Sequence, residues 1–322
     1  MAGRALISGA AGLLGSACAA ALLDRGYEIV ALVRDRDPRS RLYSERLVDR
    51  CVEVRAELAD AERLLARYEP ELVLHLGAQT QVPVAMASPV GTFEANVRGT
   101  WLLLEACRLA RRRPAAIVVA SSDKAYGEAP LPYREDGPLQ PRAPYDVSKA
   151  CTDLIARSYA STYELPIAVT RCGNLYGPGD LNRERLVPGA LFSLLRGEAP
   201  RLRSTGGMSR EWLYVDDAAA ANLRILDGLA AGEPLTARAF NVGGGEVDTV
   251  RGVVERLCAL VPGAPAPIFA MTDPSGEIPH QALDSGALQA LGWRARVPLS
   301  EGLARTAAWA AAILGSEVPA GA

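Results

Sequence analysis

The chain has 322 residues, enough for one large or two modest domains with a substantial core. Its 35 basic and 37 acidic residues nearly balance. This argues against a nucleic-acid partner, because phosphate-binding surfaces need a clustered basic excess. No run of about 18 uninterrupted apolar residues occurs, so no membrane partner is expected.

The six cysteines form no CxxC pair, which predicts reduced thiols in a cytoplasmic protein, and no metal site is expected. Glycines interrupt the alanine- and leucine-rich run that follows Arg4. This run is therefore interpreted as part of the mature protein and not as a signal peptide.

A strand, a glycine turn and a helix open the chain. Residues 5–8 predict a short strand, and Gly9, Gly12 and Gly15 lead into a helix that ends near Arg25. Glycines at this spacing let the backbone approach a pyrophosphate, and the helix N-terminus offers free N–H groups. The alternative is that the glycines only permit close packing of helix on strand.

Further strands are expected at residues 28–33, 52–58, 72–76, 115–120 and 167–171, with helices at 89–112 and 146–163 between the later ones. The alternation predicts an α/β fold, a Rossmann doubly wound parallel sheet. We expect residues 1–173, with about 212–245, to form an NAD(P)-binding domain. About 174–211 and 246–322 would form a smaller, loop-rich substrate-binding region.

Arg34 follows the second expected strand, where dinucleotide folds contact the adenosine ribose. An acidic residue there favours the free 2′-hydroxyl of NAD, whereas an arginine suits the 2′-phosphate of NADP. A solvated loop arginine is the alternative. The choice between NAD and NADP stays open at this point.

A stretch from Ser122 to Lys149 holds the candidate catalytic residues. Ser122, Asp123 and Lys124 follow an apolar strand, where open α/β sheets bind ligands. Tyr145 and Lys149 are four residues apart on one helical face, and a neighbouring ammonium is expected to lower the pKa of the tyrosine. The alternatives are a core tyrosine and a solvated ion pair between Asp123 and Lys124.

Several motifs occur together in order: the glycine turn, Ser122, Tyr145 with Lys149, the turn at residues 174–179, and the run at 210–217. In this combination the chain resembles the extended short-chain dehydrogenases/reductases, the NAD-dependent epimerase/dehydratase family. Residues 75–79, 89–100, 122–124 and 283–293 are most similar to CDP-glucose 4,6-dehydratases.

The resemblance implies a tightly bound, recycled NAD, a nucleoside-diphosphate-sugar substrate and a 4,6-dehydratase reaction, with a CDP-glucose-like substrate. A 4-epimerase or uronate decarboxylase with the same machinery is the alternative, and a non-enzymatic NAD(P)-binding regulator is a third class. The helices at 89–112 and 146–163 resemble those that pair in homodimers of this superfamily.

The resemblance also implies residue roles. Tyr145 would take the proton of the sugar 4-hydroxyl, Lys149 would hold the nicotinamide ribose, and Asp123 would protonate the departing 6-hydroxyl. Lys124 stands where many hexose dehydratases have a glutamate base, so the base at C5 is left open. The expected cofactor contacts are Gly9, Gly12, Leu13, Leu14, Gly15, Arg34, Glu57, Leu58, Leu76, Gly77, Ala78, Gln79, Asn96, Tyr145, Lys149 and Cys172. The expected substrate contacts are Gln81, Ser122, Asn174, Val187, Arg210 and Glu277.

Overall fold

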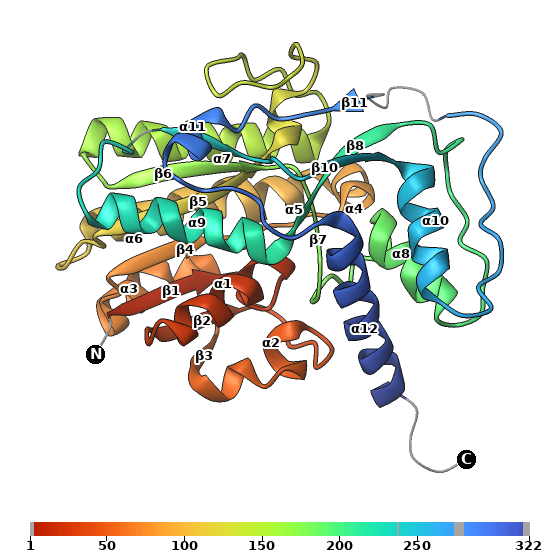
Figure 1. The fold of residues 1–322 in the computed structure, drawn as a ribbon. Helices are drawn as coiled ribbons and strands as arrows, with labels where there is room; N and C mark the ends of the chain where they lie inside the picture. Colours follow the sequence, from red (N-terminus) through yellow and green to blue (C-terminus); the bar gives the residue numbers. More distant parts are fainter. Residues whose placement is uncertain (1–2, 237, 274–279, 318–322) are drawn as a thin grey trace.

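A parallel sheet forms the centre of the larger part of the molecule (Figure 1). The computed structural model describes residues 3–236, 238–273 and 280–317. Neighbouring strands of the sheet are parallel throughout, in the order β3-β2-β1-β4-β5-β6-β9. The order reverses between β1 and β4, which is the topological switch point of a doubly wound fold. The expected α/β fold is confirmed. The strands are β1 (Arg4–Ser8), β2 (Glu28–Val33), β3 (Cys51–Arg55), β4 (Leu72–His75), β5 (Ala116–Ser122), β6 (Ile167–Cys172) and β9 (Ala239–Val242).

Helices cover both faces of this sheet because alternate strand residues point to opposite sides. In β1, Ala5 and Ile7 enter one apolar core and Leu6 enters the other. Helices α1 (Leu13–Asp24) and α9 (Val215–Ala230) pack together over the first core. Helices α3 (Ala61–Tyr68), α6 (Gly99–Leu109) and α7 (Pro144–Tyr163) cover the second. No helix of the described residues is long and apolar enough to cross a membrane.

A smaller region follows β6 and is built on a second sheet, in which β8 (Ser209–Tyr214) pairs with β7 (Asn174–Tyr176), β10 (Glu246–Thr249) and β11 (His280–Gln281). Helices α8 (Leu186–Leu194), α10 (Val250–Leu260) and α12 (Leu299–Glu317) surround a core of their own. The region is therefore less loop-rich than expected. The spacing of Val250, Val253, Val254 and Leu257 places an apolar stripe on one helical face, and this stripe makes α10 a stable helix.

Several expected boundaries are wrong. Strand β3 ends at Arg55, because the chain then enters the 3₁₀ turn Leu58–Asp60 that leads into α3. The expected helix over 89–112 consists of α5 (Pro89–Phe93), a π-helical turn (Glu94–Arg98) and α6. Single π-helical turns occur often at functional sites. Shorter helices are α2 (Arg41–Ser44), α4 (Val82–Ala87) and α11 (Gly286–Ala290), with a further 3₁₀ turn at Leu47–Arg50.

Candidate active site

The glycine turn between β1 and α1 leaves no room for side chains. Gly9 has φ +71°, and a Cβ atom there would lie 2.6 Å from the Gly77 Cα atom. A Cβ atom on Gly15 would lie 2.1 Å from the Gly9 carbonyl oxygen. The backbone of α1 begins at Leu13, with Gly12 as the N-cap and no side-chain cap. This backbone cradle fits a pyrophosphate, which the helix N-terminus attracts through its N–H groups and dipole.

The other expected cofactor contacts follow the carboxyl ends of neighbouring strands, so the fold gathers them along one edge of the sheet. Arg34 follows β2, is 70% exposed, and pairs with Asp35 at 2.6 Å. Glu57 and Leu58 follow β3, and Cys172 is the buried last residue of β6. The remaining contacts, Leu76, Gly77, Ala78 and Gln79, directly follow β4.

Asn96, in the π-helical turn, connects this edge of the sheet to α7 through hydrogen bonds. Its side chain accepts a hydrogen bond from the Gln79 N–H at 2.6 Å and donates to the Gln79 carbonyl at 3.0 Å. It also donates to the Ser148 hydroxyl at 2.9 Å, and Ser148 precedes Lys149 on α7. A single buried amide therefore holds the turn after β4 against the helix that carries Tyr145 and Lys149.

His75 belongs to the same buried network. Its Nδ1 lies 2.7 Å from the Ser8 hydroxyl, and its Nε2 lies 3.0 Å from the Thr100 hydroxyl. Burial, with a smaller effect of Lys149, lowers the pKa of His75 to about 3. His75 is therefore neutral and links β1, β4 and α6 beneath the glycine turn.

Ser122, Asp123, Tyr145 and Lys149 come together at the carboxyl end of β5. The Ser122 hydroxyl donates to the Asp123 carboxylate at 3.0 Å. Lys149 donates from Nζ to the Ala120 carbonyl at 2.8 Å. A side-chain hydrogen bond with Ser122 favours the ionised form of Tyr145. The structure thus assembles these four expected catalytic residues in one place.

The pKa values in this group differ from the expected ones. Burial raises the pKa of Tyr145 to about 12 and outweighs the hydrogen bond with Ser122. The expectation that Lys149 lowers the tyrosine pKa is therefore wrong for the protein alone. The Lys149 ammonium is bound to the Ala120 carbonyl, and burial lowers its own pKa to about 8. Burial also raises the pKa of Asp123, against the opposing effect of Lys124, and this favours the protonated carboxyl.

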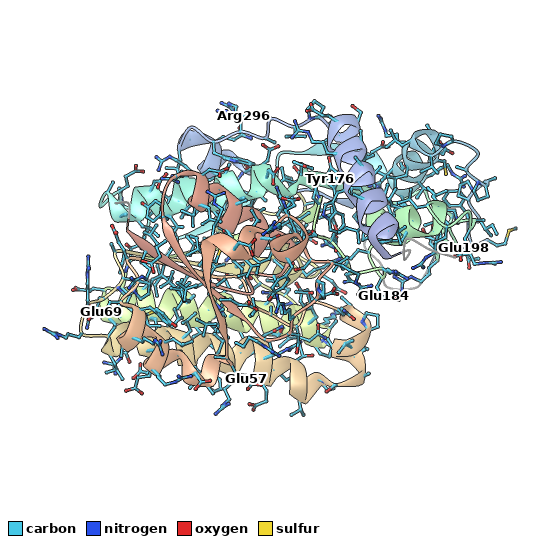
Figure 2. All side chains as sticks on the ribbon, turned by 90° about the horizontal axis from the view of Figure 1, so that it is seen from below. Glu57, Glu69, Tyr176, Glu184, Glu198 and Arg296 are labelled. Carbon is cyan, nitrogen blue, oxygen red and sulfur yellow. The ribbon has the colours of Figure 1, made fainter. Side chains whose placement is uncertain are left out.

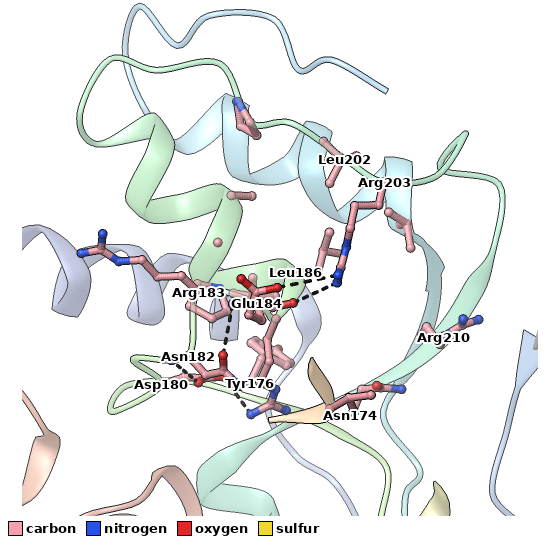
Figure 3. A pocket seen from close by; sticks show the side chains of 18 of the residues that line it. Asn174, Tyr176, Asp180, Asn182, Arg183, Glu184, Leu186, Leu202, Arg203 and Arg210 are labelled. Atoms are coloured by element: carbon pink, nitrogen blue, oxygen red, sulfur yellow. Dashed lines mark hydrogen bonds and ion pairs between the residues drawn. The ribbon is translucent and has the colours of Figure 1, made fainter. Parts of the chain in front are cut away.

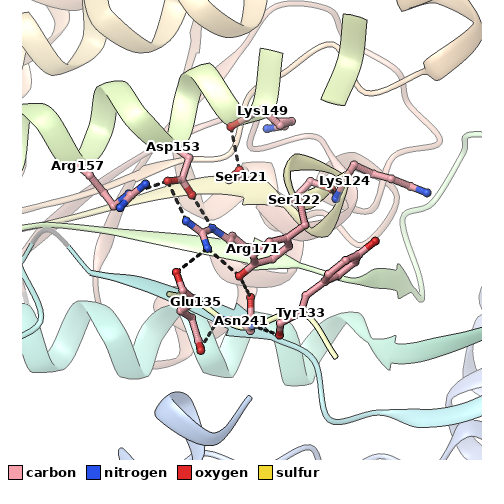
Figure 4. Close-up of polar contacts among 11 residues, drawn as sticks. Ser121, Ser122, Lys124, Tyr133, Glu135, Lys149, Asp153, Arg157, Arg171 and Asn241 are labelled. Atoms are coloured by element: carbon pink, nitrogen blue, oxygen red, sulfur yellow. Dashed lines mark hydrogen bonds and ion pairs between the residues drawn. The ribbon is translucent and has the colours of Figure 1, made fainter. Parts of the chain in front are cut away.

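A buried charge network lies behind the Asp123 turn (Figure 4). Arg171 is 1% exposed and bonds Asp153 at 2.8 and 3.1 Å. It also donates to the Tyr126 hydroxyl at 2.7 Å, and Tyr126 in turn donates to Asn241 at 2.7 Å. The Tyr126 ring stacks on Tyr133 with 4.7 Å between centroids. Since Tyr126 closes the 3₁₀ turn Asp123–Tyr126, the network anchors the segment that carries Asp123 and Lys124.

A cavity of about 1230 Å³ opens between this group and the smaller region (Figure 3). Asn174 and Arg210 line it from the adjacent strands β7 and β8. Figure 2 shows Glu184 and Glu198, two further lining residues, on the smaller region, away from Glu57 at the sheet. Basic side chains outnumber acidic ones among the described residues that line the cavity: Lys124, Arg183, Arg185, Arg196, Arg201, Arg203 and Arg210 against Asp146, Asp180, Glu184 and Glu198. An excess of guanidinium groups suits a phosphorylated ligand.

The expected substrate contacts are only partly gathered there. Asn174, Val187 and Arg210 line the cavity. Gln81 is the exposed N-cap of α4, between the lining residues Thr80 and Val82. Glu277 lies outside the described residues. Ser122 is buried and does not line the cavity; its hydroxyl contacts Asp123, which precedes the lining residue Lys124.

Most of the arginines of the cavity, and Asp146, were not among the residues predicted from the sequence. Arg183, Arg185, Arg201 and Arg203 are spread over loops that flank α8, so they form no continuous basic run. The chain as a whole has nearly balanced charge, so the number of arginines between residues 183 and 210 could have indicated a basic site. Asp146 was visible as an acidic residue directly after Tyr145.

Comparisons with known proteins place these features in a family. The model of the NAD dependent epimerase/dehydratase family matches residues 5–243. The chain is 32% identical to a UDP-glucose 4-epimerase of Mycolicibacterium smegmatis, over 94% of this chain and 97% of the relative. It is 29% identical to dTDP-glucose 4,6-dehydratase 1 of Escherichia coli K12, over 95% of this chain and 92% of the relative.

The fold gives the same result. The structure matches a crystal structure of DesIV, a dTDP-glucose 4,6-dehydratase from Streptomyces venezuelae with NAD bound, with a TM-score of 0.83 and 32% identity. The match covers 95% of this chain and 96% of the other. With a glycine cradle, a serine–tyrosine–lysine group and a family match over most of its length, the chain belongs to the NAD-dependent epimerase/dehydratase family.

Proposed function

We propose that the protein is a nucleoside-diphosphate-hexose 4,6-dehydratase. The observation that carries this proposal is Asp123, a buried acid in hydrogen-bond contact with Ser122 and kept toward its protonated form by its surroundings. Removal of the sugar 6-hydroxyl needs such a proton donor, whereas epimerisation at C4 has no leaving group to protonate.

NAD is the proposed cofactor. At Gly9 and Gly15 the backbone carries no side chain, so a pyrophosphate can approach it closely. Arg34, the residue that suggested NADP, forms an ion pair with Asp35. That carboxylate would repel a 2′-phosphate. When bound, NAD supplies reversible hydride acceptance from a sugar carbon.

The residues of the chain provide the proton transfers and the binding contacts. Tyr145 accepts the proton of the sugar 4-hydroxyl, with Ser122 hydrogen-bonded to the reacting oxygen. Lys149 and Asn96 hold the cofactor side of the site. The positive charge of bound NAD, added to that of Lys149, would favour the phenolate that the reaction requires and that the protein alone does not favour. The 4-keto group makes the C5 proton acidic, and Asp123 protonates the departing 6-hydroxyl.

Cytidine, thymidine, uridine and guanosine diphosphates are the nucleotides to be compared. The Ser122-Asp123-Lys124 sequence supports the CDP-glucose-like substrate expected from the resemblance, while relatives from E. coli and S. venezuelae are named for dTDP-glucose. The smaller region, about residues 174–211 and 246–322, is the proposed binding region for the nucleotide sugar, because its β7, β8 and α8 supply much of the cavity wall.

A 4-epimerase is the second candidate, favoured by the M. smegmatis relative at 32% identity. Incubation of the pure protein with CDP-, dTDP-, UDP- and GDP-glucose and with the corresponding glucuronates, followed by mass spectrometry and sugar analysis, separates the candidates. Loss of one water from any of them supports the dehydratase. Unchanged mass with a new sugar supports the epimerase. Loss of carbon dioxide from a uronate substrate supports the decarboxylase.

The assembly we propose is a homodimer that buries the helices next to the site. Val90, Phe93, Trp101 and Leu154 are exposed apolar side chains on α5, α6 and α7, which pack against one another. A second copy of the same surface would cover them, as in isologous dimers. Sedimentation at micromolar concentration is expected to show a dimer that Trp101→Glu dissociates. A monomer alone in the unmodified protein contradicts the proposal.

A further inference from the structure

Asp146 brings a second carboxyl group to the cavity, one residue after Tyr145. It lies in the first turn of α7, is partly buried, and lines the cavity together with Lys124. An acidic residue that only stabilised the helix N-terminus would have a lowered pKa. Burial instead raises the pKa of Asp146 to about 6, with a further increase from Asp123 and an opposing effect of Lys124. Asp146 is therefore an ionised group at neutral pH that takes up a proton readily.

Asp123 and Asp146 stand in different surroundings. Asp123 is almost completely buried, whereas Asp146 faces the cavity. Tyr133 and Tyr145 also lie within electrostatic reach of both carboxyl groups. Elimination of water across C5 and C6 needs a proton acceptor at C5 and a proton donor at the 6-hydroxyl. Two carboxyl groups whose pKa values are set by different environments are the usual way in which one site supplies both.

Lys124 is the competing candidate for the acceptor. An ammonium group has no lone pair and cannot accept a proton while it is charged. Its effect on Asp123 and Asp146 is to favour their ionised forms. Figure 4 shows the Lys124 side chain extending away from Ser122. Lys124 is therefore better explained as a cation that lowers the pKa of both carboxyl groups than as the proton acceptor.

We propose that Asp146 is the general base that removes the C5 proton, with Asp123 as the acid for the 6-hydroxyl. This inference rests on the proposed dehydratase function. The Asp146 carboxylate takes the C5 proton, and the electrons of the C5–H bond form the C5–C6 double bond. The C6–O bond breaks with its electron pair, and the departing hydroxyl leaves as water with the proton of Asp123. When the hydrogen removed from C4 returns to C6, Asp146 gives the proton back to C5. Tyr145 releases to solvent the proton that it took from the 4-hydroxyl, and solvent reprotonates Asp123, so the three groups return to their starting states.

The test uses the holoenzyme and the nucleotide sugar that the unmodified protein dehydrates. Asp146→Asn should still form the 4-keto sugar, because Ser122, Tyr145 and Lys149 are unchanged. Water loss should slow by about 10²- to 10⁴-fold, the usual effect of removing a positioned general base. Glu164→Gln, which removes a carboxylate from the far end of α7, is the matched control and should dehydrate at the unmodified rate. Circular dichroism checks that each variant is folded.

Chemical rescue separates a base from a structural residue. Formate should restore water loss in Asp146→Ala, and the unmodified rate should fall below pH of about 6 as Asp146 becomes protonated. Water loss by Asp146→Asn near the unmodified rate overturns the proposal, as does failure of formate to rescue Asp146→Ala. Rescue of Lys124→Ala by methylamine in that second case assigns the base to Lys124. If the unmodified protein removes water from no nucleotide sugar, the proposed function itself fails.

Discussion

Replacing Arg171 by methionine tests whether the buried network supports the active-site turn. The substitution removes two bonds to Asp153, which is 0% exposed, one bond to Tyr126 and one to the Glu135 carbonyl. Within the described part of the chain, the ion pair that Asp153 then keeps is the one with Arg157, whose side chain is 34% exposed. Removing one partner of a buried ion pair costs about 3–5 kcal/mol when the other charge is left uncompensated, and the remaining pair with Arg157 places the expected loss near the lower end of this range. Arg171→Met should lower the free energy of unfolding by about this amount.

Urea unfolding followed by circular dichroism gives this free energy. The double variant Arg171→Met with Asp153→Leu removes both charges, so it should be more stable than Arg171→Met alone. A loss below about 1 kcal/mol for the single variant, or a double variant that loses the sum of both single changes, would refute the reasoning. Because Tyr126 ends the Asp123 turn, the single variant should also slow turnover.

Three further predictions concern the cofactor edge and the catalytic group. Tyr145→Phe should reduce turnover below a few per cent of the unmodified rate, while the nucleotide released on denaturation still shows NAD; substantial residual activity would sink the assignment. Gly15→Ala should lose bound NAD, since its Cβ would lie 2.1 Å from the Gly9 carbonyl oxygen, and an unchanged NAD content would contradict the cradle. The pKa of His75 is about 3 when folded, against an ordinary 6.5, so the unfolded state binds the extra proton between these values. Stability should therefore fall as pH drops from 6.5 toward 3, and urea midpoints of His75→Gln should depend less steeply on pH.

The sequence predicted the parallel sheet because local patterns determine it: apolar runs make buried strands, and glycines mark the turn after β1. It did not predict the division of the 89–112 helix. Asn96 in the π-helical turn makes tertiary bonds to Gln79 and Ser148, and no local pattern encodes these bonds.

The grouping of Ser122, Asp123, Tyr145 and Lys149 was predictable from the sequence, but its electrostatics were not. The pKa of Tyr145 depends on burial that only the folded protein creates, and this reversed the expected direction. The arginines of the cavity lie on β8 and on loops around α8, and the residues between them prevent a continuous basic run. Asp146 became a candidate base only from the folded structure, which places it within electrostatic reach of Asp123 and Lys124.

The dehydratase proposal is tested most directly by the fate of the hydrogen at C4 of the sugar. The measurement uses nucleoside-diphosphate-glucose deuterated at C4, with product analysis by mass spectrometry and nuclear magnetic resonance. We predict a 4-keto product that has lost one water and carries the deuterium at C6, since the proposed reaction returns that hydrogen within one turnover. A product that keeps its 6-hydroxyl and carries the deuterium at C4 with inverted configuration would contradict the proposal and identify an epimerase.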